Sequence, residues 1–314
     1  MAAAAAATDA GGSRARRENP GAGASLYVGR FAPSPTGDLH LGSLYTAVAS
    51  YLDARSQGGR WLLRIEDLDR PREVPGAAAS IVSTLEAFGF EWDGGIVRQA
   101  ERTAHYASAL EALRARGLIF ECSCSRLKLA EEERYPGTCR QGPQVPDAAT
   151  ASRLRVDPGY VHFRDRIQGS YRQDVAAAVG DVILKRRDQQ FAYLLAVVVD
   201  DAAQGVTHVV RGADLLDNTP RQIHLQRLLG LHTPIYAHLP VLVEADGSKL
   251  AKSARSLPLQ GRAALPQLLS VFGLLGLAPP ASLATETIGA AWTWAIAQWD
   301  MNRVAGRLTR PLGG

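Results

Sequence analysis

The sequence is poor in cysteine and has no long apolar run. These two shortages argue against a disulfide-rich secreted protein and against a membrane-spanning protein. Only three cysteines occur among 314 residues, so a disulfide framework would leave one thiol over. The longest apolar run, Leu194 to Val199, is followed by two aspartates and is far shorter than the roughly 20 residues of a membrane helix. We therefore expect a protein of a reducing compartment, cytoplasmic and without a membrane span.

A strong charge of one sign is also absent. The formal net charge is only +4, which neither predicts nor excludes nucleic-acid binding. Hydrophobic residues make up 46% of the chain and charged residues 21%, enough for one catalytic domain with a smaller appendage. Residues 1–25 differ, because Ala, Gly and a few clustered arginines dominate them. This composition predicts a disordered tail.

A motif rich in glycine and proline occupies positions 30–43, RFAPSPTGDLHLGS. It follows an apolar run and precedes apolar residues at helical spacing, which predicts a strand, a turn and a helix. The N-terminus of such a helix offers unpaired amides to an anion, and Gly37 and Gly42 would let a phosphate approach the backbone. His40 would then touch a phosphate.

A lysine loop near the end of the chain is the second candidate for phosphate binding. Lys249 and Lys252 follow the turn Asp246-Gly247-Ser248, in a polar stretch that runs to Ser253. Taken alone, either motif is more often an ordinary turn or a solvated surface. Their order along an α/β pattern favours a nucleotide site.

Both motifs resemble signatures of class I aminoacyl-tRNA synthetases of the glutamate type. Residues 30–43 are similar to the HIGH signature, and residues 249–253 are similar to the KMSKS loop, with Leu250 in place of Met. Three further segments, 64–70, 85–93 and 210–216, resemble internal signatures of the same enzymes. The resemblance implies an α/β fold with a Rossmann-like parallel-sheet core.

The stretch after Ser253 is too short for the anticodon-binding region of a complete glutamyl-tRNA synthetase. A truncated core with a cysteine cluster resembles the glutamyl-queuosine tRNA(Asp) synthetases. That resemblance implies activation of L-glutamate by ATP without tRNA, then transfer to the queuosine base in the anticodon loop of tRNA(Asp), by a monomer. Two alternatives stay open: the core of a protein-synthesis glutamyl-tRNA synthetase, and a non-catalytic RNA-binding relative.

The three cysteines, Cys122, Cys124 and Cys139, lie close together in the sequence. Zinc prefers four tetrahedral ligands and binds thiolates well, yet on spacing alone ordinary reduced cysteines are as good an interpretation. The resemblance implies one structural Zn²⁺ with Tyr135 as the fourth ligand, and water is the alternative. The metal would rigidify an insert at about 118–171.

Recognition of glutamate requires cations for two carboxylates and an anion for the ammonium group. The resemblance implies Arg30 and Arg211 for the carboxylates and Glu66 for the ammonium, and apolar runs predict that each ends a strand. Tyr193 also matches, although its apolar surroundings are more typical of a core. The glutamate-binding residues implied are Arg30, Phe31, Ala32, Pro33, Ser34, Glu66, Tyr193 and Arg211.

The implied chemistry is attack of the glutamate carboxylate on the α-phosphate of ATP, which releases pyrophosphate. His40 and Lys252 are the predicted catalytic residues, because helix amides, cations and Mg²⁺ bound with ATP would stabilise the developing charge. The predicted ATP-binding residues are Gly37, His40, Gly42, Ser43, Lys249 and Lys252. The predicted organisation is a tail (1–25), two halves of the core (26–117 and 172–256) around the insert (118–171), and a mostly helical C-terminal segment (257–314).

Overall fold

The computed structural model describes residues 27–125, 127–129, 132, 134–248, 259 and 263–312. The predicted tail at 1–25 and the lysine loop, with Lys249, Lys252 and Ser253, lie outside the described residues.

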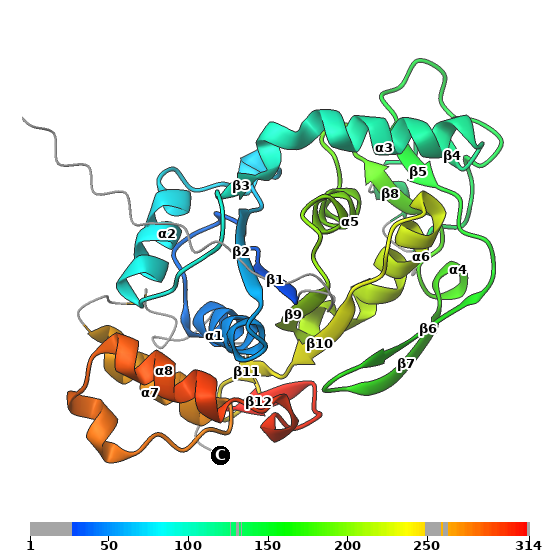
Figure 1. Ribbon diagram of the computed structural model, residues 1–314. Coiled ribbons are helices and arrows are strands. Elements are labelled where there is room, and N and C mark those ends of the chain that lie inside the picture. Colours follow the sequence, from blue (N-terminus) through cyan, green and yellow to red (C-terminus); the bar gives the residue numbers. More distant parts are fainter. Residues whose placement is uncertain are drawn as a thin grey trace, which may run out of the picture.

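A parallel sheet forms the centre of the protein (Figure 1). The strands β1 (Val28–Phe31), β2 (Arg60–Ile65) and β3 (Val97–Arg98) pair in that order, and β9 (His208–Gly212) pairs with β10 (Ile235–Leu239). The Thr207 amide donates to the Val28 carbonyl at 2.9 Å, which holds β9 beside β1. The order β3, β2, β1, β9, β10 is that of a Rossmann-like sheet and confirms the predicted fold class.

Helices cover both faces of this sheet. The side chains of β2 point alternately to the two faces and so enter two different hydrophobic cores. Trp61, Leu63 and Ile65 pack into one core, while Leu62 packs into the other. A parallel sheet is buried on both faces because its crossover helices lie on each side. The first core includes α1 (Leu41–Ser56) and α2 (Ala77–Ala87), and the second includes α3 (Thr103–Ala115), α5 (Tyr193–Ala203) and α6 (Thr219–Leu229).

An antiparallel region interrupts the core. The strands β4 (Ile119–Cys122), β5 (Ala151–Leu154) and β8 (Val182–Lys185) form a sheet in that order, and β6 (Tyr160–Asp165) forms a hairpin with β7 (Gly169–Asp174), followed by α4 (Val175–Ala178). A small third core holds the cysteines together with Phe120 and Tyr135. The sheet continues to Lys185, past the predicted end of the insert at 171, and the domain boundaries stay predictions.

The C-terminal segment packs against α1. It contains α7 (Ala264–Leu274) and α8 (Ile288–Gln298), both in the first core, and returns as β12 (Thr309–Pro311) alongside β11 (Val241–Val243). The indole of Trp292 donates to the Phe88 carbonyl at 2.9 Å, which ties α8 to the end of α2. Among the described residues, no helix combines the length and the apolar character that crossing a bilayer demands.

Candidate active site

A cleft of about 700 Å³ opens at the carboxyl ends of β1, β2 and β9. Ligands bind at this edge in open parallel sheets. The Glu66 amide donates to the Pro33 carbonyl at 2.9 Å, so the loop after β2 is tied to the loop after β1. All twelve predicted ligand-binding residues that the structure describes line this cleft: Arg30, Phe31, Ala32, Pro33, Ser34, Gly37, His40, Gly42, Ser43, Glu66, Tyr193 and Arg211.

One end of the cleft is the N-terminus of α1. His40 is the N-cap residue, and its Nδ1 accepts a hydrogen bond from the Ser43 amide at 3.3 Å. Because Nδ1 is the acceptor, the neutral ring carries its proton on Nε2 and presents a donor. A Cβ on Gly42 would approach the His40 ring to 3.1 Å, and Gly37 has a φ of 151°, so glycine suits both positions.

The other end of the cleft is held by a buried network of charges. Arg64 is fully buried and lies 2.8 Å from Asp201 and 3.2 Å from Glu66. Arg30 contacts the same Asp201 oxygen from β1 at 3.5 Å. Two guanidinium groups and two carboxylates therefore balance one another beneath the cleft, as buried charges must.

The ionisation of the two carboxylates differs. Burial opposes ionisation of Asp201, but Arg64 and Arg30 outweigh it and lower the pKa of this carboxyl. Burial also raises the pKa of Glu66, and here Arg64 and Arg30 offset it only in part. Of the two carboxylates, Glu66 is consequently the one whose burial the arginines compensate less fully.

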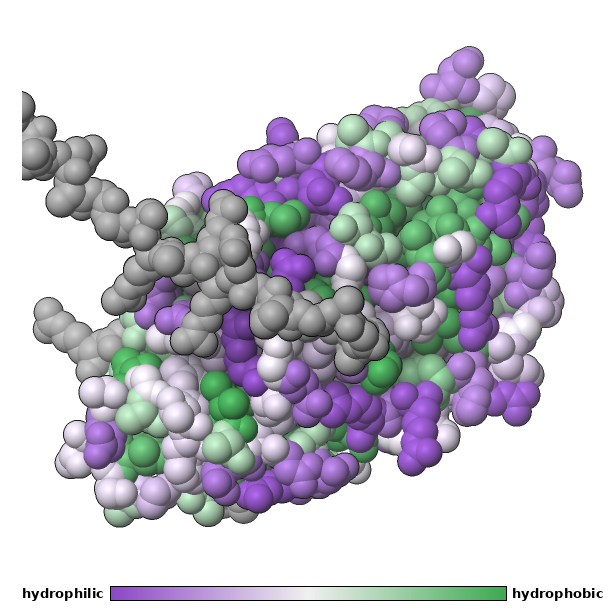
Figure 2. Space-filling model, viewed as in Figure 1, coloured by the Kyte–Doolittle hydropathy of each residue, from purple (hydrophilic) through white to green (hydrophobic). Residues whose placement is uncertain are grey.

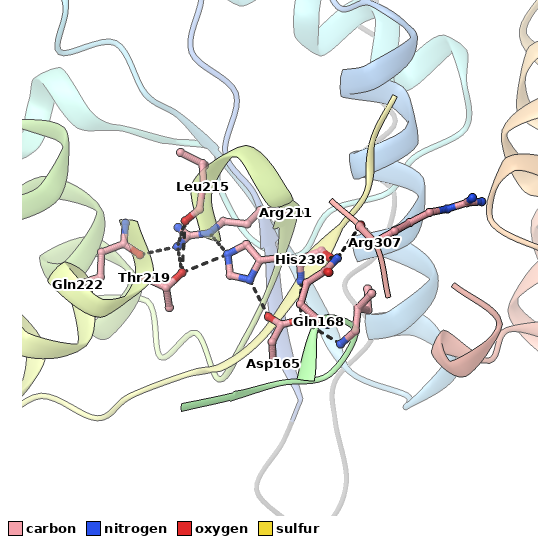
Figure 3. Close-up of polar contacts among 9 residues, drawn as sticks. Asp165, Gln168, Arg211, Leu215, Thr219, Gln222, His238 and Arg307 are labelled. Carbon is pink, nitrogen blue, oxygen red and sulfur yellow. Dashed lines mark hydrogen bonds and ion pairs between the residues drawn. The ribbon is translucent and has the colours of Figure 1, made fainter. Parts of the chain in front are cut away.

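Arg211, at the end of β9, is 4% exposed and held on two sides. Its Nη2 donates to Thr219 Oγ1 and to Gln222 Oε1, each at 2.8 Å, and its Nε donates to His238 Nε2 at 3.0 Å (Figure 3). Nη1 is buried and has no hydrogen-bond partner among the residues that the structure describes. A buried donor without a partner is costly, and a ligand carboxylate would satisfy it.

Tyr193 lies at the cleft and not in the core, which its apolar neighbours in the sequence had suggested. It is the first residue of α5 and is 37% exposed at the cleft. Desolvation and the nearby Glu66 carboxylate raise the pKa of its phenol, which stays a neutral donor at pH 7.

The sequence interpretation missed Arg64 and Asp201. In the sequence, Asp200 and Asp201 mark the end of an apolar run, yet both are buried in α5. Asp200 accepts from Gln99 at 2.9 Å and from Tyr106 at 2.7 Å. Because buried carboxylates need partners, two acids inside an apolar helix were an available signal. In the loop after β2, Asp69 forms an ion pair with Arg72 at 2.6 Å.

The three cysteines form one buried cluster. Their Sγ atoms lie within 4.8 Å of one another, and those of Cys124 and Cys139 are 3.6 Å apart. Ligands at about 2.3 Å from a tetrahedral Zn²⁺ would be about 3.8 Å apart. The spacing therefore fits a metal ion held by three thiolates.

Tyr135 joins this cluster, as its position in the motif implied. Its hydroxyl is 3.4 Å from the Cys122 sulfur and accepts the Cys139 amide at 2.8 Å. Burial and the bond to Cys122 raise the pKa of the phenol. Burial opposes ionisation of Cys139 as well, but the backbone amides of Gln144 and Ser123 outweigh it and lower the pKa of this thiol to about 6.

One cleft at the edge of a parallel sheet combines groups suited to binding phosphate with groups suited to binding carboxylates. This combination defines the core of a nucleotide-dependent ligase. Residues 27–261 match the family described as "tRNA synthetases class I (E and Q), catalytic domain". The glutamyl-Q tRNA(Asp) synthetase of Pseudomonas paraeruginosa is 54% identical over 91% of this chain and 98% of its own length. That of Ectopseudomonas mendocina is also 54% identical, over 89% and 95%.

The fold is likewise similar to the crystal structure of glutamate-tRNA synthetase from Elizabethkingia anophelis. The TM-score is 0.76 at 23% identity, over 92% of this chain and 68% of that one. The chain thus belongs to the class I aminoacyl-tRNA synthetases for glutamate and glutamine and, within them, to the glutamyl-Q tRNA(Asp) synthetase family of ligases.

Proposed function

We propose that this enzyme forms glutamyl-adenylate from L-glutamate and ATP without tRNA, and transfers the glutamate to the queuosine base of tRNA(Asp). The observation that carries the proposal is that one cleft has groups suited to phosphate at one end and groups suited to glutamate at the other. The N-terminus of α1 with His40 lies at one end, and Arg30, Glu66 and Arg211 lie at the other. A carboxylate held by the arginines would face an α-phosphate near the helix.

The charges of the cleft match those of glutamate. Arg30 and Arg211 would bind the two carboxylates, because a guanidinium donates charge-assisted hydrogen bonds to a carboxylate. The unpaired Nη1 of Arg211 supports this role. Glu66 would accept the ammonium group, whose positive charge would offset the burial that raises the pKa of Glu66. Tyr193 would add a phenol.

The phosphate end would act by positioning and by stabilising charge. The α1 amides and the Nε2 proton of His40 would meet the oxygens of ATP, which binds with Mg²⁺. Lys249 and Lys252 keep their proposed roles at the departing pyrophosphate as predictions, because they lie outside the described residues. Loss of one such stabilising group costs about 3 kcal/mol in the barrier.

The acceptor is proposed from the names of the relatives at 54% identity. The anticodon loop would enter the cleft, and exposed arginines would contact its phosphates. On the hairpin of β6 and β7, Arg164 and Arg172 are exposed, and neither has an ion pair with a described residue. Arg166 is instead bound to Asp53 at 2.5 Å, so it contributes to the fold.

We also propose that the cysteine cluster holds one structural Zn²⁺. Cys122, Cys124 and Cys139 would supply three thiolates, and Tyr135 is the proposed fourth ligand because its oxygen lies at the cluster. A nearby cation would favour the phenolate and so reverse the rise in the pKa of this phenol. The ion would order the small core without taking part in glutamate transfer.

The acceptor test maps where the glutamate is attached. The enzyme is incubated with ATP, radiolabelled glutamate and either queuosine-containing tRNA(Asp) or tRNA(Glu), and each product is digested with nuclease. Label on the anticodon fragment of tRNA(Asp) is the expected result. Label on the 3′ end of tRNA(Glu) would indicate a protein-synthesis enzyme, and no label on either would favour a non-catalytic relative.

A further inference from the structure

We propose that Asp165 and His238 are positioning residues that hold the guanidinium of Arg211 in its glutamate-binding orientation. The inference rests on the proposed role of Arg211. Asp165 and His238 do not line the cleft, and neither belongs to a motif that predicted the site from the sequence. Figure 3 shows the group at the junction of β9, β10 and the hairpin of β6 and β7.

The pairing of the strands places His238 beside Arg211. The two residues are partners in the parallel register of β9 and β10, so their side chains lie on the same face. His238 is fully buried. The imidazole therefore lies between the arginine that faces the cleft and the hairpin behind it.

The hydrogen bonds determine which ring nitrogen carries the proton. Arginine Nε is always a donor, so His238 Nε2 at 3.0 Å must accept. The proton then belongs to Nδ1, which donates to Asp165 Oδ2 at 2.6 Å. This is the logic by which a buried carboxylate fixes the tautomer of a histidine whose other nitrogen acts on a third group.

Asp165 is itself held in place. Its Oδ1 accepts the amides of Ile167, Gln168 and His238 at 2.9, 2.8 and 3.1 Å. Burial opposes ionisation of Asp165, but the bond to His238 and these amides lower its pKa, and burial lowers the pKa of His238. An anionic aspartate and a neutral histidine are thus the stable forms.

Two further acceptors complete the orientation of Arg211. Thr219 and Gln222 take Nη2, and His238 takes Nε, so three protein acceptors fix the plane of the guanidinium. Within the described part of the chain, Nη1 is the nitrogen of this guanidinium that is left for a ligand. Such preorganisation lowers the entropy lost when a ligand binds.

The test uses the full-length enzyme and three substitutions. Asp165→Asn offers an amide donor to Nδ1, which favours the tautomer with a proton on Nε2, opposite the Nε–H of Arg211. His238→Leu removes the acceptor, and His238→Gln restores an oxygen acceptor. Asp174→Asn is the control, since Asp174 lies at the far end of the same hairpin and caps α4.

The first readout is ATP–pyrophosphate exchange as a function of glutamate. We expect Asp165→Asn and His238→Leu to raise the KM for glutamate about tenfold or more, with the KM for ATP changed less than about twofold. His238→Gln should recover most of the loss, and Asp174→Asn should match the wild type. Lower thermal stability of Asp165→Asn and His238→Leu with an unchanged KM for glutamate would reduce the pair to a structural role and overturn the proposal.

The second readout is nuclear magnetic resonance of the substrate-free protein. The Arg211 Nε–H signal should exchange slowly with water in the wild type and rapidly in Asp165→Asn, and the His238 nitrogen shifts should report a proton on Nδ1. If these nitrogen shifts appear but the wild type shows no glutamate-dependent ATP–pyrophosphate exchange, the proposed function fails while the positioning of Arg211 stands. Rapid exchange of the Arg211 Nε–H in the wild type would contradict the positioning itself.

Discussion

The cleft and the cysteine cluster solve the same problem of buried polar groups in different ways. In the cleft, Arg64 lies between Asp201 and Glu66, so the protein supplies both signs of charge. In the cysteine cluster, three thiols face one another, with the Tyr135 hydroxyl beside them. The cleft is organised by the protein's own charges, whereas the cysteine cluster would be organised by the proposed metal ion.

The two regions also differ in what surrounds them. The cleft is bordered by the two large cores of the molecule, and the cysteine cluster has only a small core of its own. Figure 2 shows polar residues over much of this face, with apolar residues gathered on the side where β8 and α6 lie. A hollow there of about 310 Å³ is lined by Tyr135, Ile183 and Leu194 among others. A small core would leave more of the stability to the proposed metal ion.

The largest effect is expected from Asp201→Asn. It removes the carboxylate between Arg30 and Arg64 and leaves buried positive charge uncompensated, which costs about 3–5 kcal/mol. Urea unfolding measures the loss. The control Glu111→Gln breaks a surface pair with Arg114 and should cost less than about 1 kcal/mol. Equal losses in the two variants would show that the buried network has no special weight.

The next effect is expected at the metal site. Cys139→Ser should lower the zinc content from one ion per chain to near zero and speed proteolysis within 118–171 about tenfold or more, because the small core would open. Mass spectrometry and limited trypsin digestion measure both. Ser125→Ala, in an exposed residue nearby, should change neither. Undiminished zinc content in Cys139→Ser would place the ion elsewhere.

A smaller effect is expected from Arg211→Lys. Lysine retains the charge but loses the donors that His238, Thr219 and Gln222 hold, so its ammonium would be less well oriented and the KM for glutamate should rise about tenfold, equivalent to about 1.4 kcal/mol. Steady-state exchange kinetics measure this change. Arg221→Lys is the matched control, because Arg221 lies in α6 and does not line the cleft. This variant should leave the KM for glutamate within about twofold. Equal KM values for the two variants would remove Arg211 from glutamate binding.

The smallest effect is a dependence of stability on pH. The folded state lowers the pKa of His238, so below about 6.5 the unfolded chain binds a proton that the folded chain does not, and stability falls as the pH drops. Between pH 7 and 5.5, the wild type should lose about 1 kcal/mol more than His238→Gln in urea unfolding. Other histidines with a lowered pKa, such as the half-buried His208, remain in both proteins, so their contributions cancel. Identical losses would mean that His238 titrates normally.

The sequence predicted the parts that depend on local pattern. Apolar runs predicted strands that end near Arg30, Glu66 and Arg211, and apolar residues at helical spacing predicted α1, since such periodicity reports which face is buried. The cleft-lining residues came from motifs. The partners of Arg211 could not be predicted, because His238 is 27 positions from Arg211 and reaches it through the pairing of β9 with β10, while Asp165 comes from β6, 73 positions from His238.

The distinction between the two regions is tested most directly by removing the metal and measuring activation. The enzyme would be dialysed against a chelator, shown to be free of zinc, and assayed for glutamate-dependent ATP–pyrophosphate exchange beside the same preparation with zinc restored. Our account predicts a loosened cysteine cluster with exchange retained within about twofold, because the cleft is held by Arg64, Asp201 and their partners. Loss of exchange that returns with zinc would contradict it.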